Sequence, residues 1–151
     1  MSGEYGISNV NIRRTIAHKK VEVLEINISY PKVSAPKNRL FERRFNEYYA
    51  FQMRAYESYA KTKLLKSARE SLMADVLAGG ANDFRKWGAM AHFRIGESAG
   101  EPDMLWVIQR IWIFRDNDRR GTQINQVWNT ADATVRKARE ESGSIVWENF
   151  G

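Results

Sequence analysis

The stretch NRLFERRFNEYYAFQMRAYESYAKTKLLKSARESLMADVLA, residues 38–78, decides the fold. Apolar side chains recur along it at steps of three or four residues, in the order Phe41, Phe45, Tyr49, Met53, Tyr56, Ala60, Leu64, Ala68, Leu72 and Val76. Side chains with this spacing lie on one face of an α-helix, and charged residues such as Arg43, Glu47 and Arg54 occupy the opposite face. The stretch therefore predicts one long amphipathic helix.

Both ends of this helix are marked in the sequence. Asn38 can act as the N-cap, with Pro36 just outside and Glu42 in the opening turns, and Gly79-Gly80 follows the last apolar residue. About forty helical residues would span roughly 60 Å, whereas a compact chain of this length is about 40 Å across. We therefore expect the helix to curve, or to break near residues 63–67.

The composition is that of one globular domain. Of the 151 residues, 43% are hydrophobic and only three are proline, so the chain can bury a sizeable core. We expect a flexible lead at residues 1–9 and a single domain at residues 10–151. Cysteine is absent, which excludes disulfides and thiolate metal sites.

The charge balance points to anionic partners. The net charge is +6 and the isoelectric point is about 9.7, which favours attraction to nucleic acid, to anionic lipid surfaces and to the phosphate polymers of some cell walls. The N-terminal segment lacks the apolar run of a signal peptide, and no segment reaches the roughly eighteen apolar residues of a membrane span. The protein therefore either stays inside the cell or is a soluble portion of a longer secreted or anchored chain.

Alternating segments flank the helix. Residues 10–18 and 21–30 precede it as expected strands, because apolar and polar side chains alternate there. After the helix we expect strands at residues 87–96, 104–114 and 122–129, a short helix at 131–141 capped by Thr130 or Asp132, and a last strand at 144–150. The connections are a loop at 79–86, a hairpin loop at 97–103 and a charged turn at 115–121. This order predicts an α+β domain, with one long helix packed across a mainly antiparallel sheet of about four to six strands.

The sequence contains no catalytic or cofactor motif. The two histidines, His18 and His92, fall on separate expected strands without a clustered carboxylate, so we expect no metal site. Nucleophile-elbow, zinc-protease and phosphate-loop patterns are all missing. We therefore expect a protein that is not an enzyme and that needs no cofactor.

Aromatic residues interleaved with arginine are the remaining functional signal. Trp106, Arg110 and Trp112 share one face of the expected strand 104–114, which is apolar on both faces. The charged turn that follows adds three more candidates: Arg115, Arg119 and Arg120. Aromatic rings stack on nucleobases and on the apolar faces of sugars, while arginine pairs with phosphate and carboxylate. Core packing explains the two tryptophans equally well, and a second copy of the chain is another way to cover the strand.

Three segments together resemble a known family. EVLEINISYPKV (residues 22–33), NEYYAFQMRAYESYA (residues 46–60) and Val127-Trp128-Asn129 resemble the bacterial DUF3298 and DUF4163 domains. Such domains occur in extracytoplasmic segments of RsiV-type anti-sigma factors and beside some peptidoglycan deacetylases. Members typically carry a Gly-Gly-Ala-His-Gly-like turn before that tryptophan, where this chain has residues 115–121, RDNDRRG. The resemblance implies a non-catalytic recognition domain.

Two functional hypotheses follow. The first is an extracytoplasmic recognition module that binds a protein, a cell-wall polysaccharide or an anionic polymer through the six candidate side chains. The second is a basic nucleic-acid-binding protein of the cytoplasm. An enzyme with a pocket between helix and sheet ranks last, because no spacing in the sequence suggests its chemistry.

Overall fold

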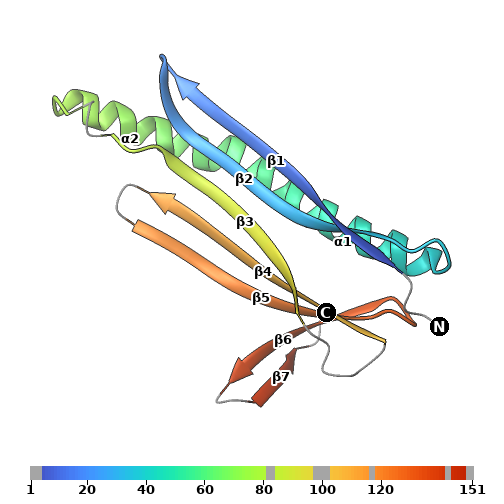
Figure 1. Cartoon of the computed structure of the whole chain (residues 1–151). Helices are drawn as coiled ribbons and strands as arrows, with labels where there is room; N and C mark the ends of the chain where they lie inside the picture. The colour runs from blue at the N-terminus through green and yellow to red at the C-terminus, as the bar shows by residue number, and fades with distance from the viewer. Residues whose placement is uncertain (1–4, 81–83, 97–102, 116–117, 142–143, 149–151) are drawn as a thin grey trace.

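A computed structural model describes residues 5–80, 84–96, 103–115, 118–141 and 144–148, with side chains through Lys137 (Figure 1). Its strands are β1 (Gly6–His18), β2 (Val21–Ser34), β3 (Trp87–Gly96), β4 (Met104–Arg115), β5 (Asp118–Asn129), β6 (Thr134–Glu141) and β7 (Ser144–Glu148). Between β2 and β3 lie α1 (Arg39–Tyr59), a π-helical turn η1 (Ala60–Leu64) and α2 (Leu65–Leu77). Parts of four expected segments, residues 1–4, 81–83, 97–102 and 149–150, fall outside the described residues.

The described strands form one seven-stranded sheet in chain order. Every neighbouring pair is antiparallel except β2 and β3, which are parallel. The long helix causes this exception, because it carries the chain back along the sheet before β3 begins. Figure 1 shows the helix lying across one face of the sheet. The α+β class and the mainly antiparallel sheet are thus confirmed.

The prediction of a short helix at residues 131–141 is wrong. Its residues form strand β6, which pairs with β5 through a tight turn. Of the two expected caps, Asp132 stabilises that turn, since its Oδ1 accepts from the Thr134 amide, whereas the Thr130 hydroxyl donates to the Asp103 carbonyl. Asn129 Oδ1 also accepts hydrogen bonds from the amides of Ala131 and Asp132. Ala133 completes the reversal with φ of 57°. Short polar side chains cap helices and stabilise turns by the same hydrogen bond, so the pattern alone did not distinguish the two.

Three strands are several residues longer than the sequence suggested, and one of them, β2, ends at Ser34 instead of residue 30. β1 begins at Gly6, inside the expected lead, and β5 begins at Asp118 instead of residue 122. Most of the expected charged turn is therefore strand, and its remaining residues, 116–117, lie outside the described ranges.

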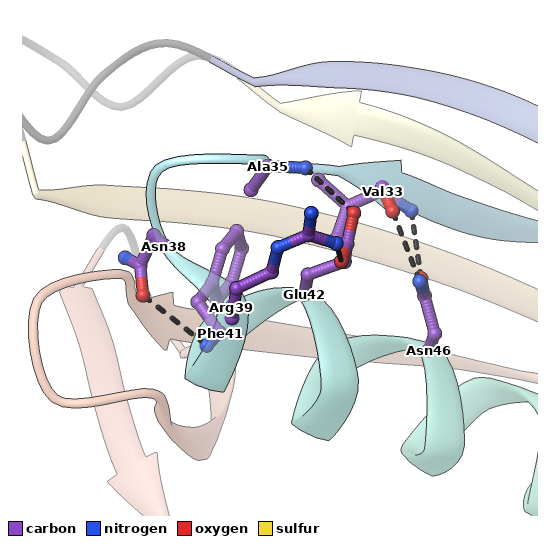
Figure 2. A network of polar contacts seen from close by, with 7 residues as sticks. All are labelled: Val33, Ala35, Asn38, Arg39, Phe41, Glu42 and Asn46. Carbon is purple, nitrogen blue, oxygen red and sulfur yellow. Dashed lines mark hydrogen bonds and ion pairs between the residues drawn. The ribbon is translucent and has the colours of Figure 1, made fainter.

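The helix carries the expected signals. Asn38 Oδ1 accepts a hydrogen bond from the Phe41 amide at 3.3 Å (Figure 2). At the other end Gly79 adopts φ of 79°, and the amides of Gly79 and Gly80 bond back to Val76 and Asp75, which is a Schellman stop. The helix does not break near residues 63–67: α1 continues into α2 through the π-helical turn η1, whose last two residues fall in that region.

The buried face of the helix matches the predicted stripe except at Tyr56, which is half-buried, and at the last residue. Phe41, Phe45, Tyr49 and Met53 are buried, whereas Val76 is 45% exposed. Val76 lies in the final turn of α2, next to the helix stop.

The end of β2 is held by helix side chains where β3 no longer pairs with it. The β2–β3 ladder runs only from Leu24 to Ile28 on β2. Beyond it, Asn46 bonds both backbone groups of Val33, accepting from its amide at 2.7 Å and donating to its carbonyl at 2.9 Å (Figure 2). Glu42 accepts from the Ala35 amide at 3.1 Å. These contacts satisfy backbone groups that would otherwise be buried unpaired.

Candidate binding site on the open face of the sheet

The residues that carry the family resemblance hold the fold together. Trp128 Nε1 donates to the Tyr49 hydroxyl at 2.8 Å, and that hydroxyl donates to Gln126 Oε1 at 2.8 Å. Burial raises the pKa of Tyr49 well above its ordinary value. Gln126 in turn donates to the Tyr48 hydroxyl at 3.3 Å. Tyr48 and Tyr49 of the helix therefore take part in the hydrogen bonds of the core, and the candidate binding site lies elsewhere.

Strand register divides the six candidate residues between the two faces of the sheet. We call the face opposite the helix the open face. It includes Trp112 on β4, which lies opposite Gly121, and Arg119 on β5, which lies opposite Phe114. Arg115 pairs with Asp118, and Arg120 pairs with Ile113, so these two arginines are on the helix side. Side chains alternate along a strand, whereas the turn expected at residues 115–121 has no such alternation, so the split was not predicted.

The two helix-side arginines have partners of their own. The Arg115 guanidinium lies 5.4 Å from the centre of the Trp87 ring. Arg120 forms an ion pair with Asp118 at 3.0 Å. Both contacts lie away from the open face, so Arg115 and Arg120 do not join Trp112 in one site.

Trp106 is also separate from Trp112, although both lie on the open face. Six residues of strand, at about 3.3 Å each, put them roughly 20 Å apart. Trp106 is half-buried beside Gly96 and Val127, and Val127 itself is buried. Trp106 therefore belongs to a separate part of the open face, next to a smaller hollow of about 180 Å³ lined by Val127, Asn129 and Arg136 among others.

An aromatic and cationic cluster surrounds Trp112. The His92 ring stacks on Trp112, with centroids 5.1 Å apart and planes 20° apart. Arg119 lies over two rings, 5.4 Å from the centre of Trp112 and 5.1 Å from that of Phe114. Arg110 lies directly opposite His92 on the neighbouring strand. We call His92, Arg110, Trp112, Phe114 and Arg119 the Trp112 cluster.

The sequence analysis did not propose His92 and Phe114 as binding residues. Phe114 has the same even spacing as Trp106, Arg110 and Trp112, so that signal was present in the sequence. The placement of His92 depends on the register of the β3–β4 hairpin, which the sequence does not provide.

A cavity of about 320 Å³ lies beside the cluster, lined by Arg110, Trp112, Arg119, Gly121 and Gln123 among others. Gly121 makes room for the tryptophan, because a Cβ at this position would lie 2.7 Å from the Trp112 Cβ and 3.2 Å from the Ile111 carbonyl oxygen. A heavy-atom approach of 2.7 Å is sterically excluded, so glycine is required for this close packing. The result is a hollow with an indole wall and two arginines at its rim.

The charge around this hollow has one sign. Arg94, Arg110 and Arg119 are exposed on the open face of β3, β4 and β5. Among the described residues of these three strands, no carboxylate shares that face. Glu25 of the neighbouring β2 shares this face but pairs with Lys86 at 4.0 Å, so the three arginines still favour an anionic ligand.

Two further observations bear on the chemistry available to the chain. Within the described ranges, no three metal-ligating side chains lie close enough to share an ion. None of the helices described here has the length and apolar character needed to cross a bilayer.

The fold belongs to a class already known from crystal structures. No family model and no curated protein matches the sequence. A member of the DUF3298 family from Bacteroides fragilis NCTC 9343 aligns over 87% of this chain and 58% of its own, with a TM-score of 0.54 and 11% identity. A DUF3298 family protein from Pseudomonas aeruginosa PAO1 aligns over 89% of this chain and 56% of its own, with a TM-score of 0.49 and 8% identity.

The protein is thus a DUF3298-like domain in fold, as the sequence resemblance implied. It spans less than two thirds of the length of either of these proteins. At such low identity the similarity concerns the fold alone, and the relation to RsiV-type anti-sigma factors stays a prediction.

Proposed function

We propose that this domain is a non-catalytic recognition module of extracytoplasmic type, and that it binds an anionic cell-wall polymer at the Trp112 cluster. The observation that carries the proposal is the hollow beside Trp112, with Arg110 and Arg119 at its rim. Sugar rings present apolar faces that can pack against the part of the Trp112 side chain that lines the hollow. Phosphate or carboxylate groups on the same polymer would pair with the two guanidinium groups.

The proposal is tested by binding to three immobilised ligands at two salt concentrations. The ligands are peptidoglycan with its attached anionic polymers, single-stranded nucleic acid and a neutral glycan. We expect retention on the cell-wall preparation that survives the higher salt, because apolar packing against Trp112 is not screened. Retention on nucleic acid alone, lost steeply with salt, would instead identify the basic nucleic-acid-binding protein.

Matched variants locate the binding surface. Trp112→Ala and Arg119→Ala should each weaken retention at least tenfold while circular dichroism and the unfolding midpoint show a folded domain. Arg120→Ala is the control, since it removes the same charge from a neighbouring residue on the other face of β5. Equal losses for Arg119→Ala and Arg120→Ala would show that only net charge matters, and would refute a site at the Trp112 cluster.

A further inference from the structure

The outer face of α1 carries an exposed aromatic residue without an evident role in the fold. Phe51 is 78% exposed, although phenylalanine is among the residues most often buried. It borders a shallow hollow together with Glu47, Ala50, Arg54 and Ala55. Glu47, Phe51 and Arg54 are exposed, away from the buried stripe of α1, and α1 itself lies on the face of the sheet opposite the Trp112 cluster.

Two opposite charges flank Phe51 along the helix. Glu47 lies one turn before it and Arg54 one turn after it, and both side chains are exposed. In the part of the chain that the structure describes, neither takes part in an ion pair. From Glu47 to Arg54 the order along the surface is therefore negative, aromatic, positive, and the exposed Arg43 and Arg44 lie about one turn before Glu47.

This order of charges is self-complementary: it matches a second copy of the same helix that runs in the opposite direction. If a second α1 runs antiparallel across the first with Phe51 near the two-fold axis, Glu47 of each copy faces Arg54 of the other. A parallel arrangement would instead oppose like charges. We propose that the outer face of α1 is a dimer interface, in which two copies of this chain pack their helices antiparallel around Phe51.

The size of the surface sets the expected strength. α1 has 21 residues and is about 31 Å long, so one helix face buries less than the roughly 800 Å² per partner of a standard stable interface. The dimer should be weak, with a dissociation constant of roughly 10 µM or higher. The two Glu47–Arg54 pairs between the copies determine how the helices align more than they determine the affinity.

The experiment is sedimentation equilibrium of the full chain from about 5 µM to 1 mM. We expect a concentration-dependent monomer–dimer equilibrium for the wild type. Glu47→Arg and Arg54→Glu should each weaken dimerisation at least tenfold, because each leaves like charges opposed. The double variant Glu47→Arg/Arg54→Glu should restore the dimer, and an equimolar mixture of the two single variants should form a heterodimer.

Two controls complete the test. Glu70→Arg makes the same charge change on an exposed site of α2 and should leave the equilibrium unchanged. Trp112→Ala should also leave it unchanged, so this inference and the proposed function fail independently. A wild type that stays monomeric at 1 mM would overturn the inference, as would single variants that dimerise normally or a double variant that does not regain the dimer.

Discussion

Asn46 should be among the most stabilising polar residues of the domain. Its side-chain amide bonds both the amide and the carbonyl of Val33, at 2.7 and 2.9 Å in a partly buried site. Asn46→Ala leaves both backbone groups unpaired, each at about 1–3 kcal/mol. The higher helix propensity of alanine offsets roughly 0.5 kcal/mol of this loss in the free energy of unfolding. We therefore expect a net loss of about 1.5–5.5 kcal/mol in the free energy of unfolding.

The assay is urea unfolding followed by circular dichroism at pH 7, with Ser58→Ala as the control on the exposed side of the same helix. The control should change the free energy of unfolding by less than about 0.5 kcal/mol. A loss below about 1 kcal/mol for Asn46→Ala would refute the reasoning, because it would mean that water or another group satisfies Val33.

Asn46→Asp adds a test with a defined sign. The ionised carboxylate still accepts from the Val33 amide but has no proton for the Val33 carbonyl, whereas the protonated form restores that donor. Folding should therefore raise the pKa of this carboxyl above its unfolded value of about 3.9. The folded state then binds the additional proton, so the variant loses stability as pH rises through the folded pKa. The stability gap to wild type should be smaller at pH 4 than at pH 7, and a pH-independent gap would contradict the double hydrogen bond.

Two further predictions concern the tyrosines of the helix. Tyr49→Phe leaves Trp128 Nε1 without an acceptor and Gln126 Oε1 without a donor, which should lower the free energy of unfolding by about 2–4 kcal/mol in urea titrations; a neutral result would show that the network is dispensable. Burial raises the pKa of Tyr56 to about 12 from its ordinary value of 10.0. The folded state thus holds this proton more tightly than the unfolded state, so stability should fall as pH rises from 10 to 12, and Tyr56→Phe should flatten that fall.

The sequence was sufficient for the parts of the fold that depend on local periodicity. The stripe from Phe41 to Leu72 predicted a helix with one buried face, and that face is buried. The caps at Asn38 and Gly79 were readable because each satisfies backbone groups only a few residues away. Strand β6 could not be predicted from the sequence, because its pairing with β5 depends on the chain reversal at Ala133. There a non-glycine residue takes a positive φ.

The candidate site was predictable only in part, because a one-residue error in the limits of a strand exchanges the faces of its side chains. Trp112 and Arg110 were placed correctly on one face by their even spacing, and the register adds Arg119 from β5. Arg120 follows Arg119 in the sequence yet lies on the opposite face, paired with Asp118. Treating residues 115–121 as a turn removed the alternation that separates them.

The two faces of the sheet have different roles, and this difference limits what the family resemblance can imply. The resemblance includes Asn46, Tyr49 and Trp128. The polar side-chain atoms of each form hydrogen bonds inside the protein. Keeping these residues preserves the packing of the helix on the sheet, and it places no constraint on the open face. The chain departs from the family pattern at residues 115–121, which contribute Arg119 and Gly121 to the hollow beside Trp112. A ligand that approaches this segment would therefore meet Arg119 and Gly121, and the shared fold alone does not define that ligand.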